Sequence, residues 1–219
     1  MTARSPQRLD CPGFLLSLAT VLLLLGACQS LPPAQNQEPA SWKGQQQSIS
    51  EIDDWSLRGR LNVRQDAQND TVNINWTQTG EDFDIRMSGT LGMGAVAVRG
   101  DASSIVVEKN GELPLALDSL DALSREYLDF DFPAAHLLYW VRGLPVPAMA
   151  MQATWNEQAL LDTLIQTDAR GQRWQLTFDR YQSHNSRYMP GRIRLEHDQI
   201  RLTFLINDWQ LHPPLLARL

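Results

Sequence analysis

The sequence predicts a mainly β protein (α+β) in which a strongly curved antiparallel sheet forms an incomplete, unclosed β-barrel. Apolar and polar residues alternate from Trp55 onward, which is the pattern of strands with one buried and one wet face. About ten such segments recur between short polar turns. Only two short helical segments interrupt them. A curved sheet of this kind surrounds an apolar interior, and short helices can cover the hydrophobic cavity on its open side.

The first half of the predicted sheet consists of segments 55–63, 72–76 and 83–87. The intervening stretches QDAQND and TQTGED are polar and short, as expected for hairpin connections. The apolar residues that share one face of these strands are Trp55, Leu57, Gly59, Leu61, Val63, Val72, Ile74, Trp76, Phe83, Ile85 and Met87.

The remaining strands fall on both sides of a helical insert. Further alternation predicts strands around 96–98, 105–107, 113–115, 174–178, 193–195 and 200–206. Between them, Asp118 or Ser119 can cap a helix that carries Leu120, Leu123, Tyr127 and Leu128. A second helix is expected with Pro133 in its first turn and Gly143 as its end.

The N-terminus resembles a lipoprotein signal peptide. An apolar run covers 14–27 and is too short for a membrane-spanning helix, which needs about 20 apolar residues. It ends in LLGAC, which is similar to the lipobox of bacterial lipoproteins, where the cysteine is lipidated and becomes the first mature residue. The alternative is an ordinary secretory signal with an incidental cysteine. The resemblance implies a signal peptide over 1–27 and lipidation of Cys28, and Gln29 after the cysteine implies the outer membrane.

The segment after the cysteine is interpreted as a tether. Residues 29–50 are rich in Gln, Pro, Ser and Ala without apolar periodicity, so 28–50 is expected to be a lipidated N-terminus and flexible linker. Residues 51–219 then form one domain. The formal net charge is −6, which suggests no basic surface for nucleic acid or phospholipid headgroups. Cys11 leaves with the signal, so no disulfide is expected in the mature chain.

Several stretches resemble the LolB outer-membrane lipoprotein receptors. They follow one another in the family's order and read WSLRGRLNV, INWTQTGEDFDIRMSGTLG, YWVRGLPVP, GQRWQLTFDRY, MPGRIRL and IRLTFLINDWQL. The resemblance implies an unclosed barrel plugged by helices, facing the periplasm of a Gram-negative bacterium. It further implies a monomer that accepts acylated lipoproteins from the periplasmic carrier LolA and inserts them among the phospholipids of the outer membrane.

The resemblance also implies two sets of site residues. A hydrophobic cavity would hold the acyl chains, and we expect it to be lined by Trp55, Leu61, Trp76, Phe83, Ile85, Trp140, Trp174 and Phe204. A protruding loop would touch the membrane through Leu91 and Met93. The family's usual PLG is TLG here, with Thr90 in place of proline, which puts the rigidity of this loop in question.

No residue pattern points to catalysis, a cofactor or a metal. The four histidines are isolated from one another, and neither a metal-binding motif nor a G-x-S-x-G elbow occurs. His184 and His197 are expected to be solvated in polar loops. Two alternatives to a receptor remain: an envelope scaffold with a fully packed core, and an enzyme on a lipid tether, for which no constellation argues.

The sequence makes one prediction about the loop. Burying one leucine side chain contributes about 1.5–3 kcal/mol, which suits a reversible touch on a bilayer. Leu91→Glu should therefore leave folding and acyl binding intact and slow the insertion of lipoproteins into liposomes. Insertion at the wild-type rate would contradict the loop's role, and unfolding of the variant would show that Leu91 belongs to the core.

Overall fold

The centre of the fold is the antiparallel pairing of β1 (Asp54–Gln65) with β13 (Ile200–His212), which joins the two ends of the domain. The computed structural model describes residues 38–89, 94–101, 103–127 and 131–212. The expected signal peptide, Cys28 and the loop residues Thr90, Leu91 and Met93 lie outside the described residues.

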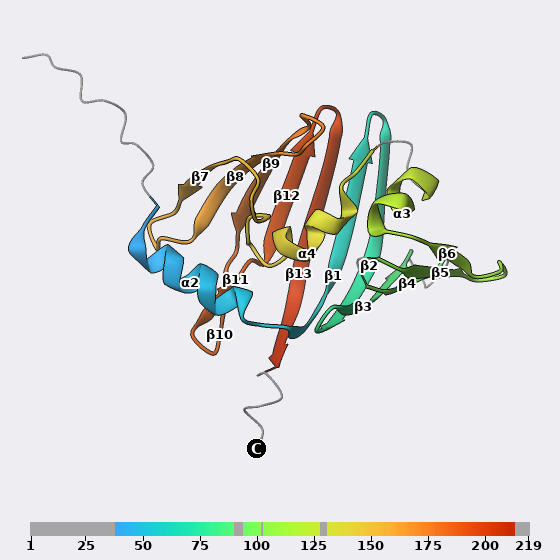
Figure 1. Ribbon diagram of the computed structural model, residues 1–219, viewed down its shortest axis with the longest axis horizontal. Helices are drawn as coiled ribbons and strands as arrows, with labels where there is room; N and C mark the ends of the chain where they lie inside the picture. Colours follow the sequence, from blue (N-terminus) through green and yellow to red (C-terminus); the bar gives the residue numbers. More distant parts are fainter. Residues whose placement is uncertain (1–37, 90–93, 102, 128–130, 213–219) are drawn as a thin grey trace, which may run out of the picture. The chain divides into compact units, whose positions relative to one another are not determined.

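All but two strands belong to one eleven-stranded antiparallel sheet with the order β6-β5-β4-β3-β2-β1-β13-β12-β9-β8-β7. Its edge strands, β6 and β7, do not pair with each other, so the curved sheet stays open (Figure 1). The strands not yet bounded are β2 (Gln68–Thr79), β3 (Asp82–Ser88), β4 (Val96–Gly100), β5 (Ile105–Lys109), β6 (Leu115–Leu117), β7 (Met151–Trp155), β8 (Leu161–Thr167), β9 (Arg173–Asp179) and β12 (Arg192–His197). A separate hairpin pairs β10 (Gln182–His184) with β11 (Arg187–Met189).

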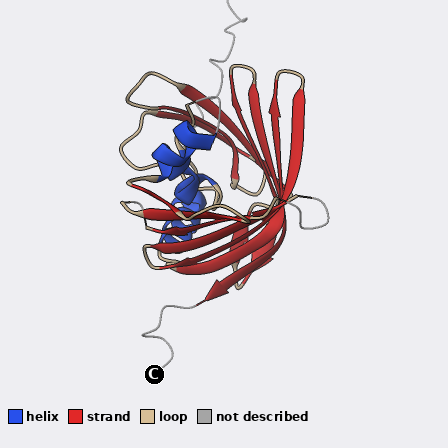
Figure 2. Cartoon of the chain, turned by 90° about the vertical axis from the view of Figure 1, so that its right-hand side faces the viewer, coloured by secondary structure: helices blue, strands red, loops and turns tan. Residues whose placement is uncertain are grey.

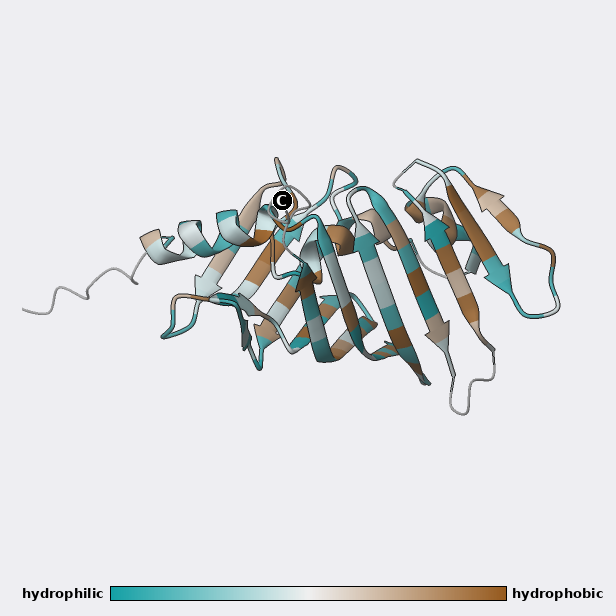
Figure 3. Cartoon of the chain, turned by 90° about the horizontal axis from the view of Figure 1, so that it is seen from below, coloured by the Kyte–Doolittle hydropathy of each residue, from teal (hydrophilic) through white to brown (hydrophobic). Residues whose placement is uncertain are grey.

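The helices lie on the concave side of the sheet (Figure 2). They are α2 (Ala40–Ser50), α3 (Leu120–Tyr127), the 3₁₀ helix η2 (Ala134–His136) and α4 (Leu137–Trp140). The predicted cap of α3 is confirmed, because the Ala122 amide donates to Ser119 Oγ at 3.1 Å. Gly143 has a φ of 73° just past α4, which confirms it as the point where helical structure stops. Bands of hydrophilic and hydrophobic residues alternate along the strands (Figure 3), as the sequence predicts.

The expected flexible linker is wrong over residues 40–50, which form helix α2. Trp42 and Ile49 lie two turns apart on one face of α2, and both are buried in the core. The helix is also tied to β11, since Arg187 Nε donates to the Ser48 carbonyl oxygen at 3.0 Å. Two apolar residues among glutamines give too weak a periodicity to reveal a helix whose burial depends on partners far along the chain.

Other differences concern the strands. The sequence analysis identified neither β7, β8 nor the β10–β11 hairpin, so the described part of the chain holds more strands than expected. Leu113, expected in a strand with Leu115, precedes β6 and is 91% exposed. Pro114 has no backbone N–H to donate to a neighbouring strand. Pairing of this segment with β5 therefore begins only at Leu115.

A β-bulge in β13, where Asn207 has no partner, lies opposite a glycine of β1 that no other residue can replace without a clash. The register between β1 and β13 shifts between Arg58 and Gly59. A Cβ on Gly59 would overlap the carbonyl oxygen of Leu205 on the paired strand. Only glycine therefore allows the backbone of β1 at position 59 to lie this close to the carbonyl group of Leu205 in β13.

Gly59→Ala should lower the free energy of unfolding by about 1–3 kcal/mol, because the backbone of β13 must move aside. Gly44→Ala is the matched control. Gly44 lies inside α2 with nothing within 4 Å of an added Cβ, so alanine there should stabilise by about 0.5–1 kcal/mol. Urea unfolding of both variants measures the difference, and equal stabilities would contradict the assigned close approach at Gly59.

Candidate functional site

An apolar cavity of about 320 Å³ lies between the sheet and the helices that cover it. Its floor is the concave face of β1–β4 and β13, and its roof is α3, η2, the start of α4 and the segment before η2. The lining residues are almost all apolar: Leu61, Val63, Val72, Ile74, Trp76, Ile85, Met87, Gly94, Val96, Val98, Leu120, Leu123, Ser124, Tyr127, Phe132, Ala134, Leu137, Leu202 and Phe204. Among the residues that the structure describes, no charged side chain lines this space.

Ser124, the buried polar side chain among the described residues of the roof, forms its hydrogen bonds within the roof. Its hydroxyl donates to the carbonyl oxygen of Phe132 at 2.7 Å and lies 2.9 Å from the carbonyl oxygen of Asp121. The hydroxyl proton therefore has acceptors other than a ligand. The cavity offers an occupant apolar contacts and little else.

Side-chain size explains why one half of the sheet is hollow. Over β1–β4 the inward residues are mostly Val, Ile, Leu and Met, and the roof presents Ser124 and Ala134 to them. The other half is filled by large residues. Trp140 of α4 packs 6.0 Å from Trp174 of β9, and Phe132 packs 5.2 Å from the same ring. The Trp140 indole also donates to the buried Gln166 Oε1 at 2.9 Å, which fixes α4 over β8.

The structure brings four of the eight expected cavity residues together. Leu61, Trp76, Ile85 and Phe204 line the apolar cavity. Trp55, Phe83, Trp140 and Trp174 do not line it and are buried in the core. The sequence reasoning favoured aromatic residues and passed over the small aliphatic ones, although their alternation already placed Val72, Ile74, Met87, Val96 and Val98 on the same face.

The rim of the cavity lies at the end of the sheet where β1 turns into β2. Val63 and Val72, and the paired Met87 and Val96, line the cavity there and are only half-buried. Met87 lies near the end of β3, and Val96 begins β4. The segment that carries Leu91 and Met93 therefore joins two strands that border this rim.

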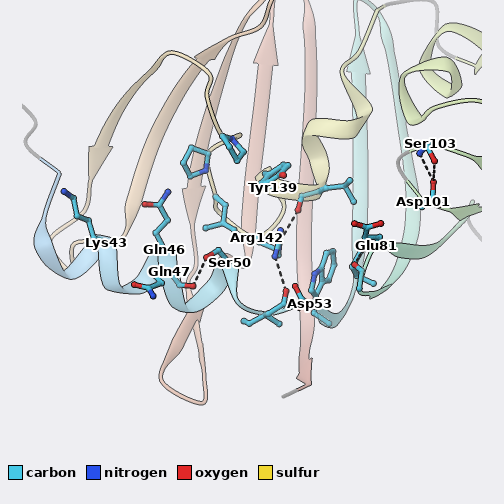
Figure 4. A pocket seen from close by; sticks show the side chains of 18 residues that line it. Lys43, Gln46, Gln47, Ser50, Asp53, Glu81, Asp101, Ser103, Tyr139 and Arg142 are labelled. Atoms are coloured by element: carbon cyan, nitrogen blue, oxygen red, sulfur yellow. Dashed lines mark hydrogen bonds between the residues drawn. The ribbon is translucent and has the colours of Figure 1, made fainter. Parts of the chain in front are cut away.

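A second hollow, of about 730 Å³ and mixed polarity, lies between α2, α4 and the opposite ends of β1 and β2 (Figure 4). Trp55 belongs to its wall. Arg142 projects into it and donates to the carbonyl oxygens of Leu138 and Ile52 at 3.0 and 3.2 Å. Burial lowers the pKa of the Arg142 guanidinium, and the two carbonyls tie α4 to the chain just before β1. We assign Arg142 a structural role.

Ion pairs hold the roof to the hairpin between β8 and β9. Arg170 in that turn pairs with Asp131, and its Nη2 lies 3.8 Å from Asp121 on α3. Asp121 Oδ1 also accepts the amide hydrogen of Ala135 at 3.1 Å. These pairs are partly exposed, and each exposed pair contributes about 0–1 kcal/mol, so they add little to the burial of Leu120, Phe132 and Ala134, which holds the roof in place.

Both histidines expected to be solvated in polar loops lie in strands instead: His184 ends β10 and is half-buried, and His197 ends β12. His197 stacks on Trp174 with ring centroids 4.7 Å apart. Its Nδ1 lies 3.0 Å from the carbonyl oxygen of Arg173. Ser183 and His184 are successive residues of β10, so their side chains leave opposite faces of the strand. The described residues hold no group of three or more His, Cys, Asp or Glu that could bind a metal.

The fold and the roofed cavity place the chain in a class of open, helix-covered half-barrels that includes the LolA superfamily. A LolA-superfamily protein of Nitrosomonas europaea superimposes with a TM-score of 0.52 at 11% identity, over 78% of this chain and 94% of that one. A putative outer membrane lipoprotein-sorting protein domain from Vibrio parahaemolyticus gives a TM-score of 0.54 at 8% identity, over 80% and 91% of the two chains. At these identities the likeness concerns the fold alone.

The chain belongs to the LolB family of outer-membrane lipoproteins. The family model described as outer membrane lipoprotein LolB matches residues 53–209. Outer-membrane lipoprotein LolB of Stutzerimonas stutzeri is 32% identical over 86% of this chain and 91% of its own length. That of Pseudomonas aeruginosa is 32% identical over 88% and 93%. None of the helices in the described part of the chain has the length and apolar character that a bilayer span requires.

The roof should weaken in mild acid. Burial lowers the pKa of His136 below its ordinary value; its ring centroid lies 5.1 Å from that of Trp140. The carboxylates of Asp121 and Asp168 oppose this shift, and the charge of Arg170 adds to it. The unfolded chain therefore binds a proton at a higher pH than the folded one, so His136 reduces stability as pH falls below about 6.5. Urea unfolding from pH 7.5 to pH 5 should show a shallower loss in His136→Phe than in the wild type. Parallel pH profiles would contradict this assignment.

Proposed function

We propose that this domain accepts lipoproteins from the carrier LolA, holds their acyl chains in the apolar cavity and delivers them to the outer membrane. The observation that carries the proposal is the cavity roofed by α3 and η2, whose described lining residues are all uncharged. Membership of the LolB family and the LolA-like fold support the same role.

The chemistry of the lining favours an acyl chain over other ligands. Each methylene moved from water into an apolar space contributes about 0.8 kcal/mol. The peptide part of a lipoprotein would have to leave its water without new hydrogen bonds, because the lining offers almost none. Acyl chains therefore enter, and the attached peptide stays outside.

Holding several acyl chains in this cavity would require the roof to move outward. Its volume, about 320 Å³, is at the lower end of the range of about 300–1,000 Å³ for ligand sites. Several acyl chains need more room than this. The exposed ion pairs of Arg170 are weak enough to part when α3 is displaced outward.

Handover without an energy source requires a difference in affinity between carrier and receptor. A difference of about 1.4 kcal/mol biases the equilibrium tenfold. One or two additional buried methylenes supply that amount. Leu91 and Met93, on the segment that follows the cavity rim, would then make the contact with the bilayer during release, and acyl chains on Cys28 would keep the domain at the membrane.

An envelope scaffold is the competing function. A scaffold needs no space in its core, whereas the described core is densely filled in one half and hollow in the other. Uptake of a fluorescent fatty acid by the chain from residue 29 onward separates the two, because a scaffold would bind none.

Filling the cavity should block its function. Val96→Phe points a larger side chain into the cavity from β4 and removes room for about two methylenes, so acyl affinity should fall about tenfold. Transfer of an acylated lipoprotein from purified carrier to the receptor, and from there to liposomes, should slow in parallel.

The matched control is Val106→Phe on the neighbouring strand β5. Val106 is 39% exposed and faces outward, so the same change adds the same volume outside the cavity. Circular dichroism should show both variants folded. If Val96→Phe bound and transferred acyl ligands as well as Val106→Phe does, the cavity would not be the binding site.

A further inference from the structure

The convex face of the sheet carries a group of positive charges, although the net charge of the whole chain is negative. The chain has a formal net charge of −6. Along β1, however, Arg58, Arg60 and Arg64 are all exposed and alternate with residues that face the interior. Because successive side chains of a strand leave opposite faces, these three arginines share the convex side, away from the helices (Figure 2).

A fourth arginine extends this group across the central strands. Arg194 of β12 is paired in register with Thr203 of β13, which in turn lies opposite Asn62 of β1. Neighbouring strands are about 4.8 Å apart, so Arg194 lies about 10 Å from the arginine row of β1. We call Arg58, Arg60, Arg64 and Arg194 the convex basic patch. On its other side, the residues of β2 opposite these β1 positions are uncharged: Asn69, Thr71, Asn73 and Asn75.

The four guanidinium groups of the patch have no ion-pair or hydrogen-bond partner among the described residues. Four other arginines on the outer face of the sheet are paired with carboxylates: Arg86 with Asp84, Arg99 with Glu108, Arg192 with Asp179 and Arg201 with Glu196. Arg173, at the start of β9 and also exposed, has no such partner among the described residues, but it lies two strands further from β1 than β13 does. Asp208 lies opposite Arg58 in register but forms no ion pair with it within 4 Å.

This arrangement does not serve folding. Like charges gathered on one face of a sheet repel one another and reduce stability. Because these guanidinium groups are not engaged by carboxylates of the described residues, they are free to bind an anionic partner.

We propose that the convex basic patch binds the phosphate headgroups of anionic phospholipids at the membrane surface. The guanidinium group is suited to phosphate, because its planar donors can bind two oxygens at once. A row of exposed arginines on the back of a sheet matches the flat, laterally adaptable surface of a bilayer, which needs no shape complementarity. The membership of the chain in an outer-membrane lipoprotein family places such a surface close by.

The patch also lies near the mouth of the cavity. Arg60 and Arg64 alternate along β1 with Leu61 and Val63, which line the cavity on the other face. Headgroup contact through these arginines would therefore hold the mouth end of the sheet against the bilayer. This positioning effect rests on the proposed function, whereas the binding of headgroups does not.

The test measures vesicle binding by the chain from residue 29 onward, which lacks the lipid anchor and retains the whole compact unit that begins at Glu38. Binding to phosphatidylcholine vesicles is compared with binding to vesicles in which part of this lipid is replaced by phosphatidylglycerol. Each basic residue near an anionic surface contributes about 1 kcal/mol, or about fivefold in the partition constant. Arg60→Gln/Arg64→Gln should therefore weaken binding to the anionic vesicles about 25-fold, and salt should weaken wild-type binding.

A charge-matched variant, Lys43→Gln/Arg125→Gln, controls for net charge. Lys43 lies on α2 and Arg125 on α3, both on the concave side, so its vesicle binding should remain close to that of the wild type. Equal binding of the wild type to both kinds of vesicle, or equal losses in the two double variants, would overturn the proposal.

Two further readouts distinguish this proposal from others. Uptake of a fluorescent fatty acid should be the same in Arg60→Gln/Arg64→Gln as in the wild type. If neither protein took up the fatty acid, the proposed acyl binding would be wrong, and the binding of headgroups by the patch would still be decided by the vesicle experiment. If the variant lost affinity for purified LolA and kept its binding to anionic vesicles, the patch would be a protein-docking surface and the lipid proposal would be wrong.

Discussion

The pairing of β1 with β13 is the constraint on which the rest of the structure depends. Twelve residues of β1 are in register with the last strand of the domain, with one bulge in β13 opposite Gly59. This contact joins the two ends of the domain and leaves each half of the sheet as a meander of neighbouring strands. On the buried side of this pairing, Trp55 packs against Trp76 and Trp209. Its ring centroid lies 5.3 Å from that of Trp76 and 5.6 Å from that of Trp209.

The two halves of the sheet differ in what covers their concave side. Over β8, β9 and β12, tryptophan and phenylalanine fill the concave side, and Gln166 fixes α4 through the Trp140 indole. Over β1–β4, aliphatic side chains of moderate size meet a serine and an alanine of the roof and leave a cavity. The packed half leaves no comparable space, and the proposed acyl binding therefore concerns the hollow half.

Strand β1 contributes residues to both proposed binding surfaces, the apolar cavity and the convex basic patch. Its inward residues Leu61 and Val63 line the apolar cavity, and its outward residues Arg60 and Arg64 belong to the convex basic patch. A period of two residues thus separates a surface suited to acyl chains from one suited to phosphate. The thickness of a single sheet lies between the two surfaces, so the proposed acyl site and the proposed headgroup site are on opposite faces of the same strand.

The sequence by itself determined the mainly β class, the open curved sheet, the cap at Ser119 and the stop at Gly143, because these depend on alternation and local hydrogen bonding. It also carried the family resemblance. Only the tertiary structure decided that residues 40–50 form a helix, because burial of Trp42 and Ile49 requires partners far along the chain. Tertiary structure likewise decided that Trp140 and Trp174 fill the core while Val72 and Val96 border the cavity. Alternation assigns a side chain to a face of the sheet, whereas the volume left above that face depends on what packs against it.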